Sequence, residues 1–193
     1  MNDAVARTVL LVAALNLAYF GVEFTAALRI GSVSLLADSV DFLEDAAVNI
    51  LIFLAISWSA KRRANLGFGL SALMILPAAA LLWTLVQKLS GAVTPDPFTL
   101  TLVGAGALAI NFTCASLLAR HRKQQSNLIR AAFLSARNDV LANIAIIGAG
   151  LLTYATLSIW PDIVVGLGIA ALNLDAAREV WEAARRESRT PVA

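Results

Sequence analysis

Long apolar segments are the feature that most constrains how this chain can fold. A helix needs about 20 mostly apolar residues to cross the hydrocarbon core of a bilayer, which is about 30 Å thick. Six segments of the 193-residue chain reach or nearly reach that length, at residues 8–29, 33–59, 66–88, 98–119, 127–155 and 161–186. Only 15% of the residues are charged, against about 25% in soluble domains. The sequence therefore predicts an all-α integral membrane protein with six transmembrane helices.

Short polar connections separate the six segments and leave no length for a second folded unit. We expect one transmembrane domain over residues 1–186 and a short cytoplasmic tail at 187–193. Lysine and arginine gather in alternate connections, a distribution typical of the cytoplasmic side, at positions 7, 61–63, 120, 122, 123 and 130. This pattern places both termini in the cytoplasm. A net charge of +2 provides no basic field for nucleic acid.

Four acids interrupt the second apolar segment, namely Asp38, Asp41, Glu44 and Asp45. At about 100° per residue, Asp38, Asp41 and Asp45 share one face of a helix, and Glu44 is expected to point elsewhere. An ionised acid near the bilayer centre costs about 2.5–3.5 kcal/mol, so a stripe of acids needs a cavity, a counter-charge or a metal. A purely structural stripe of protonated acids is the alternative, and Asp38, near the start of the helix, is expected to be structural.

The fifth apolar segment carries a matching polar face, formed by Ser135, Asn138, Asp139 and Asn143. For two antiparallel helices, a rise of about 1.5 Å per residue predicts Asp41 level with Asp139 and Asp45 level with Ser135. Oxygen ligands at these spacings can surround a divalent cation. Because carboxylates bind metal only when deprotonated, the cation and protons would compete for the same oxygens.

The segments that carry these residues have a recognisable pattern. They read "NLAYFGVEF", "GSVSLLADSVDFLED", "SARNDVLANIAIIGAG" and "WPDIVVGLGIAALNL", and are spread over nearly the whole chain. Together they resemble the cation diffusion facilitator family of metal/proton antiporters. In that family, His or Asp followed four residues later by Asp, on the second and fifth helices, binds the transported ion. The resemblance implies Asp41, Asp45 and Asp139 as metal ligands.

Two departures from the family bear on the site and the assembly. Ser135 stands where the family usually has His or Asp, so Asn138, Asn143 or water is expected to complete the shell. Without an imidazole the site is rich in oxygen, and Cd²⁺, Fe²⁺, Co²⁺ and Mn²⁺ are conceivable beside Zn²⁺, which the resemblance puts first.

The family usually adds a ferredoxin-like cytoplasmic domain that dimerises. The chain ends shortly after the sixth segment, so a homodimer is expected to form through the membrane helices.

Two other polar residues carry expectations of their own. Arg137 lies on the opposite side of its helix from Asp139, and an ion pair with Glu44 or Glu23 is expected. Asp162 falls in the first turn of the sixth helix, where it suits that helix's own open amide groups.

The sequence thus predicts an inner-membrane exporter, embedded in the lipid bilayer, that exchanges a divalent cation for protons by alternating access. No prosthetic group is expected, and the chain is not expected to be an enzyme. A membrane subunit of the same fold that binds metal or a partner without transport is the alternative.

Overall fold

The computed structural model describes residues 3–54, 75–91, 93–121 and 127–172, and every regular element in those ranges is a helix. In chain order the helices are α1 (Asp3–Ile30), α2 (Val33–Leu54), α4 (Ile75–Gly91), α5 (Pro97–Ala119) and α6 (Asn127–Thr156). A shorter apolar helix, Trp160–Leu172, follows α6. The all-α prediction is confirmed for this part of the chain. The predicted tail and the end of the sixth segment lie outside the described residues.

Among the described residues, three helices are long and apolar enough to cross a membrane by length and composition. They are α1, α5 and the part of α6 from Ala132 to Thr156. Helix α2 has 22 residues but includes the four acids, and α4 continues to Gly91, beyond the predicted end at 88. These findings support a membrane protein with at least three apolar spans, and the six-span topology stays a prediction.

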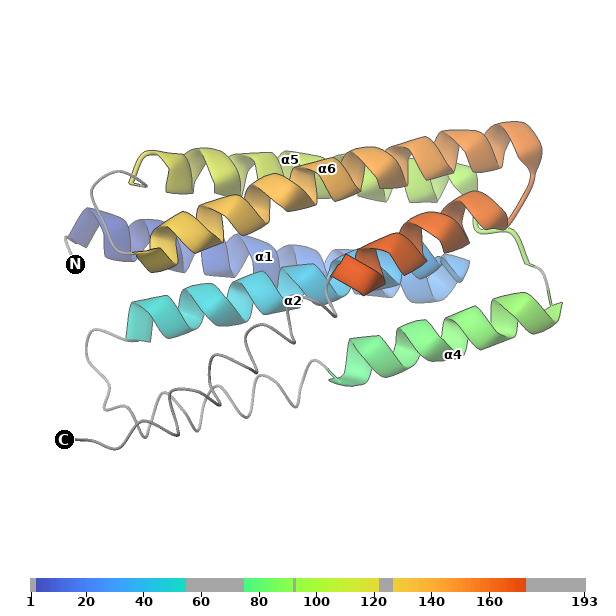
Figure 1. Cartoon of the computed structure of the whole chain (residues 1–193), viewed down its shortest axis with the longest axis horizontal. Coiled ribbons are helices and arrows are strands. Elements are labelled where there is room, and N and C mark those ends of the chain that lie inside the picture. Colours follow the sequence, from blue (N-terminus) through green and yellow to red (C-terminus); the bar gives the residue numbers. More distant parts are fainter. Residues whose placement is uncertain (1–2, 55–74, 92, 122–126, 173–193) are drawn as a thin grey trace.

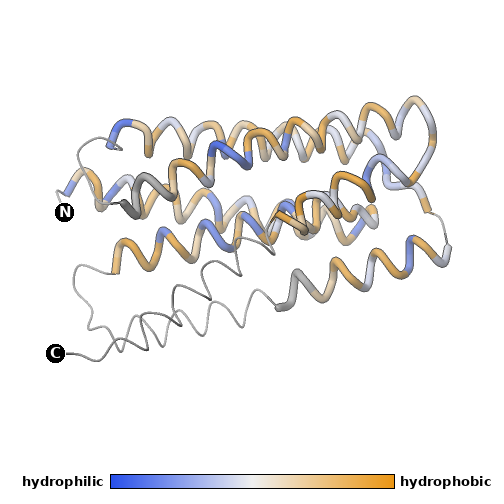
Figure 2. The backbone as a smooth tube through the Cα atoms, viewed as in Figure 1, coloured by the Kyte–Doolittle hydropathy of each residue, from blue (hydrophilic) through white to orange (hydrophobic). Residues whose placement is uncertain are grey.

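The helices pack side by side along the long axis of the molecule (Figure 1). Helix α1 packs against α2 and α5, α6 packs against α5 and α2, and α4 packs against α2. Large apolar side chains point outward from the bundle, among them Trp83, Phe98, Leu141 and Tyr154. Figure 2 shows that long hydrophobic stretches of the helices are interrupted by short hydrophilic ones. An apolar exterior around isolated internal polar groups is the arrangement that lipid requires.

Contacts between distant residues define the two ends of the bundle. At one end, Thr8 Oγ1 lies 3.3 Å from His121 Nε2, so the start of α1 meets the end of α5. At the other end, Thr94 Oγ1 donates to the carbonyl oxygen of Leu157 over 3.3 Å. Helix α5 begins there with Asp96, which accepts from the Thr99 amide. The helices therefore alternate in direction along the chain.

Glycine allows two close approaches between helices. A Cβ atom on Gly166 would lie 2.7 Å from the backbone nitrogen of Ser34, so the helix Trp160–Leu172 touches the backbone at the start of α2. A Cβ atom on Gly106 would clash with the Tyr19 hydroxyl of α1. Both glycines thus serve packing within the chain, and only a residue without a side chain fits at Gly166 because the neighbour is backbone.

Candidate metal centre

One cavity of about 890 Å³ lies between α2, α6 and the helix Trp160–Leu172. Its polar wall consists of Asp41, Glu44, Asp45, Ser135, Asn138 and Asp139. Its apolar wall includes Leu141 and Ala145 of α6 and Val164, Ile169 and Leu172 of the last described helix. All five residues predicted from the sequence as metal ligands therefore line a single cavity.

Helical periodicity explains why α2 and α6 present these groups to the same space. Asp41 and Asp45 are four residues apart, as are Ser135 and Asp139, and such pairs lie one above the other on a helix. The hydroxyl of Ser135 donates to Asp45 Oδ1 over 2.9 Å. This contact agrees with the register predicted for the two helices. It also shows that the neutral residue Ser135 holds one ligand candidate of α2 in place.

The carboxyl groups line the cavity without converging on one point. Within the described ranges, no group of three or more His, Cys, Asp or Glu side chains is close enough to hold a metal ion. Asp45 is buried, with 6% of its surface exposed, whereas Asp41 and Asp139 are half-buried and Asn138 is exposed. A cation bound by Asp41, Asp45 and Asp139 together would therefore require α2 and α6 to adjust.

Glu44 is a cavity residue that sequence reasoning missed. It was expected to point away from the acidic stripe, but it lines the same cavity as Asp41 and Asp45. The helix Trp160–Leu172 forms one wall, so the cavity extends farther around α2 than a pocket between α2 and α6 alone. The spacing of three residues from Asp41 was the available signal, since such residues are neighbours on a helix.

Arg137 does not form the expected ion pair. Its side chain is exposed and its Nη2 atom donates to Asn138 Oδ1 over 3.5 Å. Within the part of the chain that the structure describes, Lys88 and Asp162 form the only ion pair, so neither Glu44 nor Glu23 has a cationic partner there. Arg137 is exposed on α6, whereas Glu23 is fully buried inside the bundle, which explains why these two do not meet.

Asn143 does not reach the cavity, although it was a candidate for completing the shell. It is fully buried, donates to Asp38 Oδ2 over 2.7 Å and accepts from Asn111 Nδ2 over 3.3 Å. This is the interhelical role that amides usually have between membrane helices. Asp38 likewise lies outside the cavity and inside the bundle.

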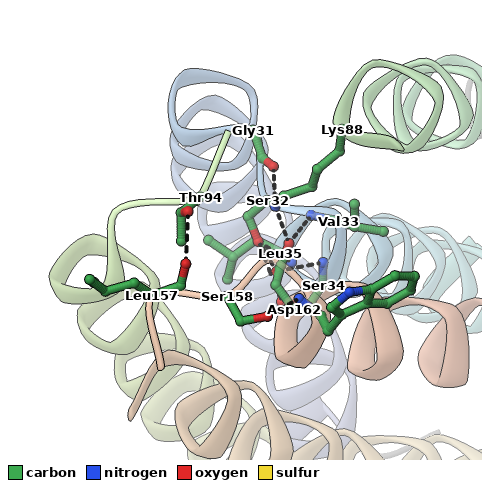
Figure 3. Close-up of polar contacts among 11 residues, drawn as sticks. Gly31, Ser32, Val33, Ser34, Leu35, Lys88, Thr94, Leu157, Ser158 and Asp162 are labelled. Carbon is green, nitrogen blue, oxygen red and sulfur yellow. Dashed lines mark hydrogen bonds and ion pairs between the residues drawn. The ribbon is translucent and has the colours of Figure 1, made fainter. Parts of the chain in front are cut away.

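A second buried polar cluster closes the end of the bundle at the start of α2 (Figure 3). Asp162 accepts from the amide nitrogens of Val33 and Ser34 at 2.9 and 3.1 Å and from the hydroxyls of Ser32 and Ser34 at 2.7 and 2.6 Å. Lys88 Nζ lies 2.6 Å from Asp162 Oδ2, the oxygen that also accepts from the Val33 amide. Asp162 therefore caps α2 and not its own helix, which corrects the sequence prediction.

Comparisons with known proteins point to one family. Residues 9–186 match the cation efflux transmembrane domain. The cation-efflux pump FieF of Salmonella typhi is 33% identical over 192 residues, which cover 90% of this chain and 60% of that protein. FieF of Salmonella arizonae is 31% identical over 192 residues, with 90% of this chain and 61% of that protein covered. The chain thus spans less than two thirds of the length of the curated relatives it matches.

Proposed function

Since this chain belongs to the cation efflux family, we propose that it exports a divalent transition-metal cation, Zn²⁺ first, and takes up protons in exchange. The observation that carries the proposal is that acids from α2 and α6 line one cavity of an otherwise apolar helix bundle. Buried acids in a membrane protein are functional by default, because they are costly unless a counter-ion or a proton neutralises them.

Asp41, Asp45 and Asp139 are proposed as the charged ligands, and Ser135 and Asn138 as neutral oxygen donors. Carboxylate oxygens bind Zn²⁺ at about 2.0–2.2 Å, so all three acids must approach a common point for the ion to be held. Binding would therefore draw α2 and α6 together. The hydrogen bond from Ser135 to Asp45 supports this assignment, because it already joins the two helices within the proposed site.

Exchange follows from competition between the ion and protons. A carboxylate must lose its proton before it binds metal, so acid on the outer side favours release of the ion and protonation of the site. In an alternating-access cycle the protonated site then returns to the cytoplasmic side. Each net charge that crosses the membrane changes the free energy by about 2.3 kcal/mol per 100 mV.

The proposed setting is an inner membrane crossed by six helices, with both termini in the cytoplasm. The basic residues predicted for alternate connections support this orientation, and Cd²⁺, Fe²⁺, Co²⁺ and Mn²⁺ stay candidates beside Zn²⁺ because the site has only oxygen donors. We also propose one transport domain over residues 1–186, a cytoplasmic tail at 187–193, and a homodimer formed through the membrane helices.

A non-transporting membrane subunit that binds metal or a partner is the second candidate. The acids that line the cavity without converging on one point favour it, as does a serine at position 135. Sealed vesicles that contain the purified chain separate the two functions. If an imposed proton gradient drives uptake of Zn²⁺, the chain is a transporter. Binding of Zn²⁺ without flux would contradict the exporter and favour the subunit.

A further inference from the structure

A pair of buried carboxyl groups lies outside the metal cavity, at the contact between α1 and α2. Glu23 of α1 and Asp38 of α2 are both fully buried, and neither lines the cavity. The rings of Tyr19 on α1 and Phe42 on α2 pack with their centroids 5.1 Å apart. Glu23 follows Tyr19 by four residues and Asp38 precedes Phe42 by four, so the two acids lie level with each other on the antiparallel helices. Asp38 precedes the cavity residues Asp41 and Asp45 by three and seven residues, which corresponds to about 4.5 and about 10 Å along the helix. The pair therefore lies outside the metal cavity, nearer to the end of the bundle where Lys88 binds Asp162.

The pair has too few hydrogen-bond donors for two carboxylates. Among the described residues, no donor reaches either oxygen of Glu23 or the Oδ1 atom of Asp38. Asp38 Oδ2 accepts one hydrogen bond, from Asn143. Tyr19 lies close to both acids, but its hydroxyl donates to the carbonyl oxygen of Val103 over 2.6 Å. Buried oxygens without a donor are costly, so one carboxyl group must itself become the donor.

Among the residues that the structure describes, no positive charge balances the pair either. The buried lysine Lys88 is bound to Asp162, and Arg29 and Arg137 have exposed side chains. The other titratable groups that act on the pair are acidic or phenolic, namely Asp41 and Asp45 of α2, Asp139 of α6 and Tyr19 of α1. Two like charges this close together repel each other strongly, and proteins relieve such a contact by sharing one proton between the two groups.

We propose that Glu23 and Asp38 form a proton-binding site of their own, in which the two carboxyl groups share one proton. When the proton binds, an O–H bond forms on one carboxyl group, that group donates to the other, and the charge of the pair falls from −2 to −1. The Asn143 amide supports the remaining charge on Asp38. The amide of Asn111 holds Asn143 in turn, so the site joins α1, α2, α5 and α6.

In the exchange of a metal cation for protons, this site could carry a proton without first releasing a metal ion. This role rests on the proposed function. Asp38, Asp41 and Asp45 follow each other at three- and four-residue steps along α2. Such steps bring side chains next to one another on a helix. A proton on the pair is thus placed between the cavity and the end of the bundle closed by Asp162.

Infrared spectroscopy of the full chain in lipid nanodiscs tests the proton site directly. Protonated carboxyl groups have a C=O stretch that carboxylates lack, and deuterium shifts it. We expect a band of this kind that is lost or shifted in both Glu23→Gln and Asp38→Asn and is retained in Asp45→Asn. Glu23→Asp, which keeps the acid, should retain a protonated band and guards against a folding defect of the glutamine variant.

Two outcomes would overturn the proposal. One is a spectrum in which no protonated band responds to Glu23→Gln or Asp38→Asn. The other is loss of the band on addition of Na⁺ or Zn²⁺ to the Asp45→Asn variant at constant pH, because a metal cation and not a proton would then occupy the pair. Failure of the proposed function is distinguishable, since a chain that does not transport Zn²⁺ would still show the band. The role as proton carrier is then tested by the number of protons transported per Zn²⁺ in vesicles that contain Glu23→Gln. A number equal to that of the original chain would contradict the role.

Discussion

The hydroxyl of Ser135 on α6 donates to Asp45 on α2 over 2.9 Å, which makes Ser135 the nearest neutral group to the proposed ligands. Replacing Ser135 with His would put an imidazole at this position. Because nitrogen ligands suit zinc better than manganese, the ratio of Zn²⁺ to Mn²⁺ affinity should rise in Ser135→His. Titrations of both metals into the purified variants measure it, with Ser135→Ala as the control for the lost hydrogen bond. If the affinity ratio of Ser135→His equals that of the original chain, residue 135 does not belong to the coordination shell.

Asp139 should be indispensable, whereas its neighbour Arg137 should not. Removing an outer-shell partner of a metal site costs about 10–100-fold in affinity, and removing a charged ligand should cost more. We therefore expect Asp139→Asn to lose high-affinity Zn²⁺ binding. Arg137→Gln, two residues away on the exposed side of α6, should bind Zn²⁺ as before. Equal affinities of the two variants would contradict the assignment of Asp139.

The ion pair between Lys88 and Asp162 should contribute strongly to stability. Both side chains are buried, with 3% and 0% exposed, and Lys88→Met would leave the carboxylate without its counter-charge. Breaking a buried pair in this way costs about 3–5 kcal/mol in the free energy of unfolding. Denaturant unfolding in detergent measures it. Gln87→Met, at the exposed neighbouring position, is the matched control, and an equally small loss in both variants would contradict the prediction.

Gly166 should be intolerant of a side chain, and Gly168 should accept one. A Cβ atom at 166 would lie 2.7 Å from the Ser34 nitrogen and from the Val33 carbonyl carbon, and backbone atoms cannot move aside cheaply. Gly168 has nothing within 4 Å. We expect Gly166→Ala to lose about 1–3 kcal/mol of stability, as overpacked sites do. Thermal unfolding of the two alanine variants compares them, and similar midpoints would show that the contact yields.

The sequence predicted the relations that depend on the geometry of single helices. The rise of about 1.5 Å per residue was enough to match Asp45 with Ser135, and hydropathy located α1, α5 and α6. The metal-binding roles of Asp41, Asp45, Asp139, Ser135 and Asn138 stay predictions, because lining one cavity is not coordination.

Contacts that depend on how a third helix packs against two others could not be predicted from the sequence. Asp162 caps the start of α2 because the helix Trp160–Leu172 packs there, and helical periodicity predicts only which residues share a face. The cavity position of Glu44 and the burial of Asn143 have the same origin. Each depends on which neighbour faces which side of a helix, and no pattern within one segment encodes that.

Calorimetry of Zn²⁺ binding to the purified full chain, at neutral and at mildly acidic pH, tests the central claim most directly. The account predicts that Zn²⁺ binds with release of protons, that acidification weakens binding, and that Asp45→Asn abolishes it. Binding that is independent of pH, or that persists unchanged in Asp45→Asn, would contradict competition between the metal and protons for these carboxylates.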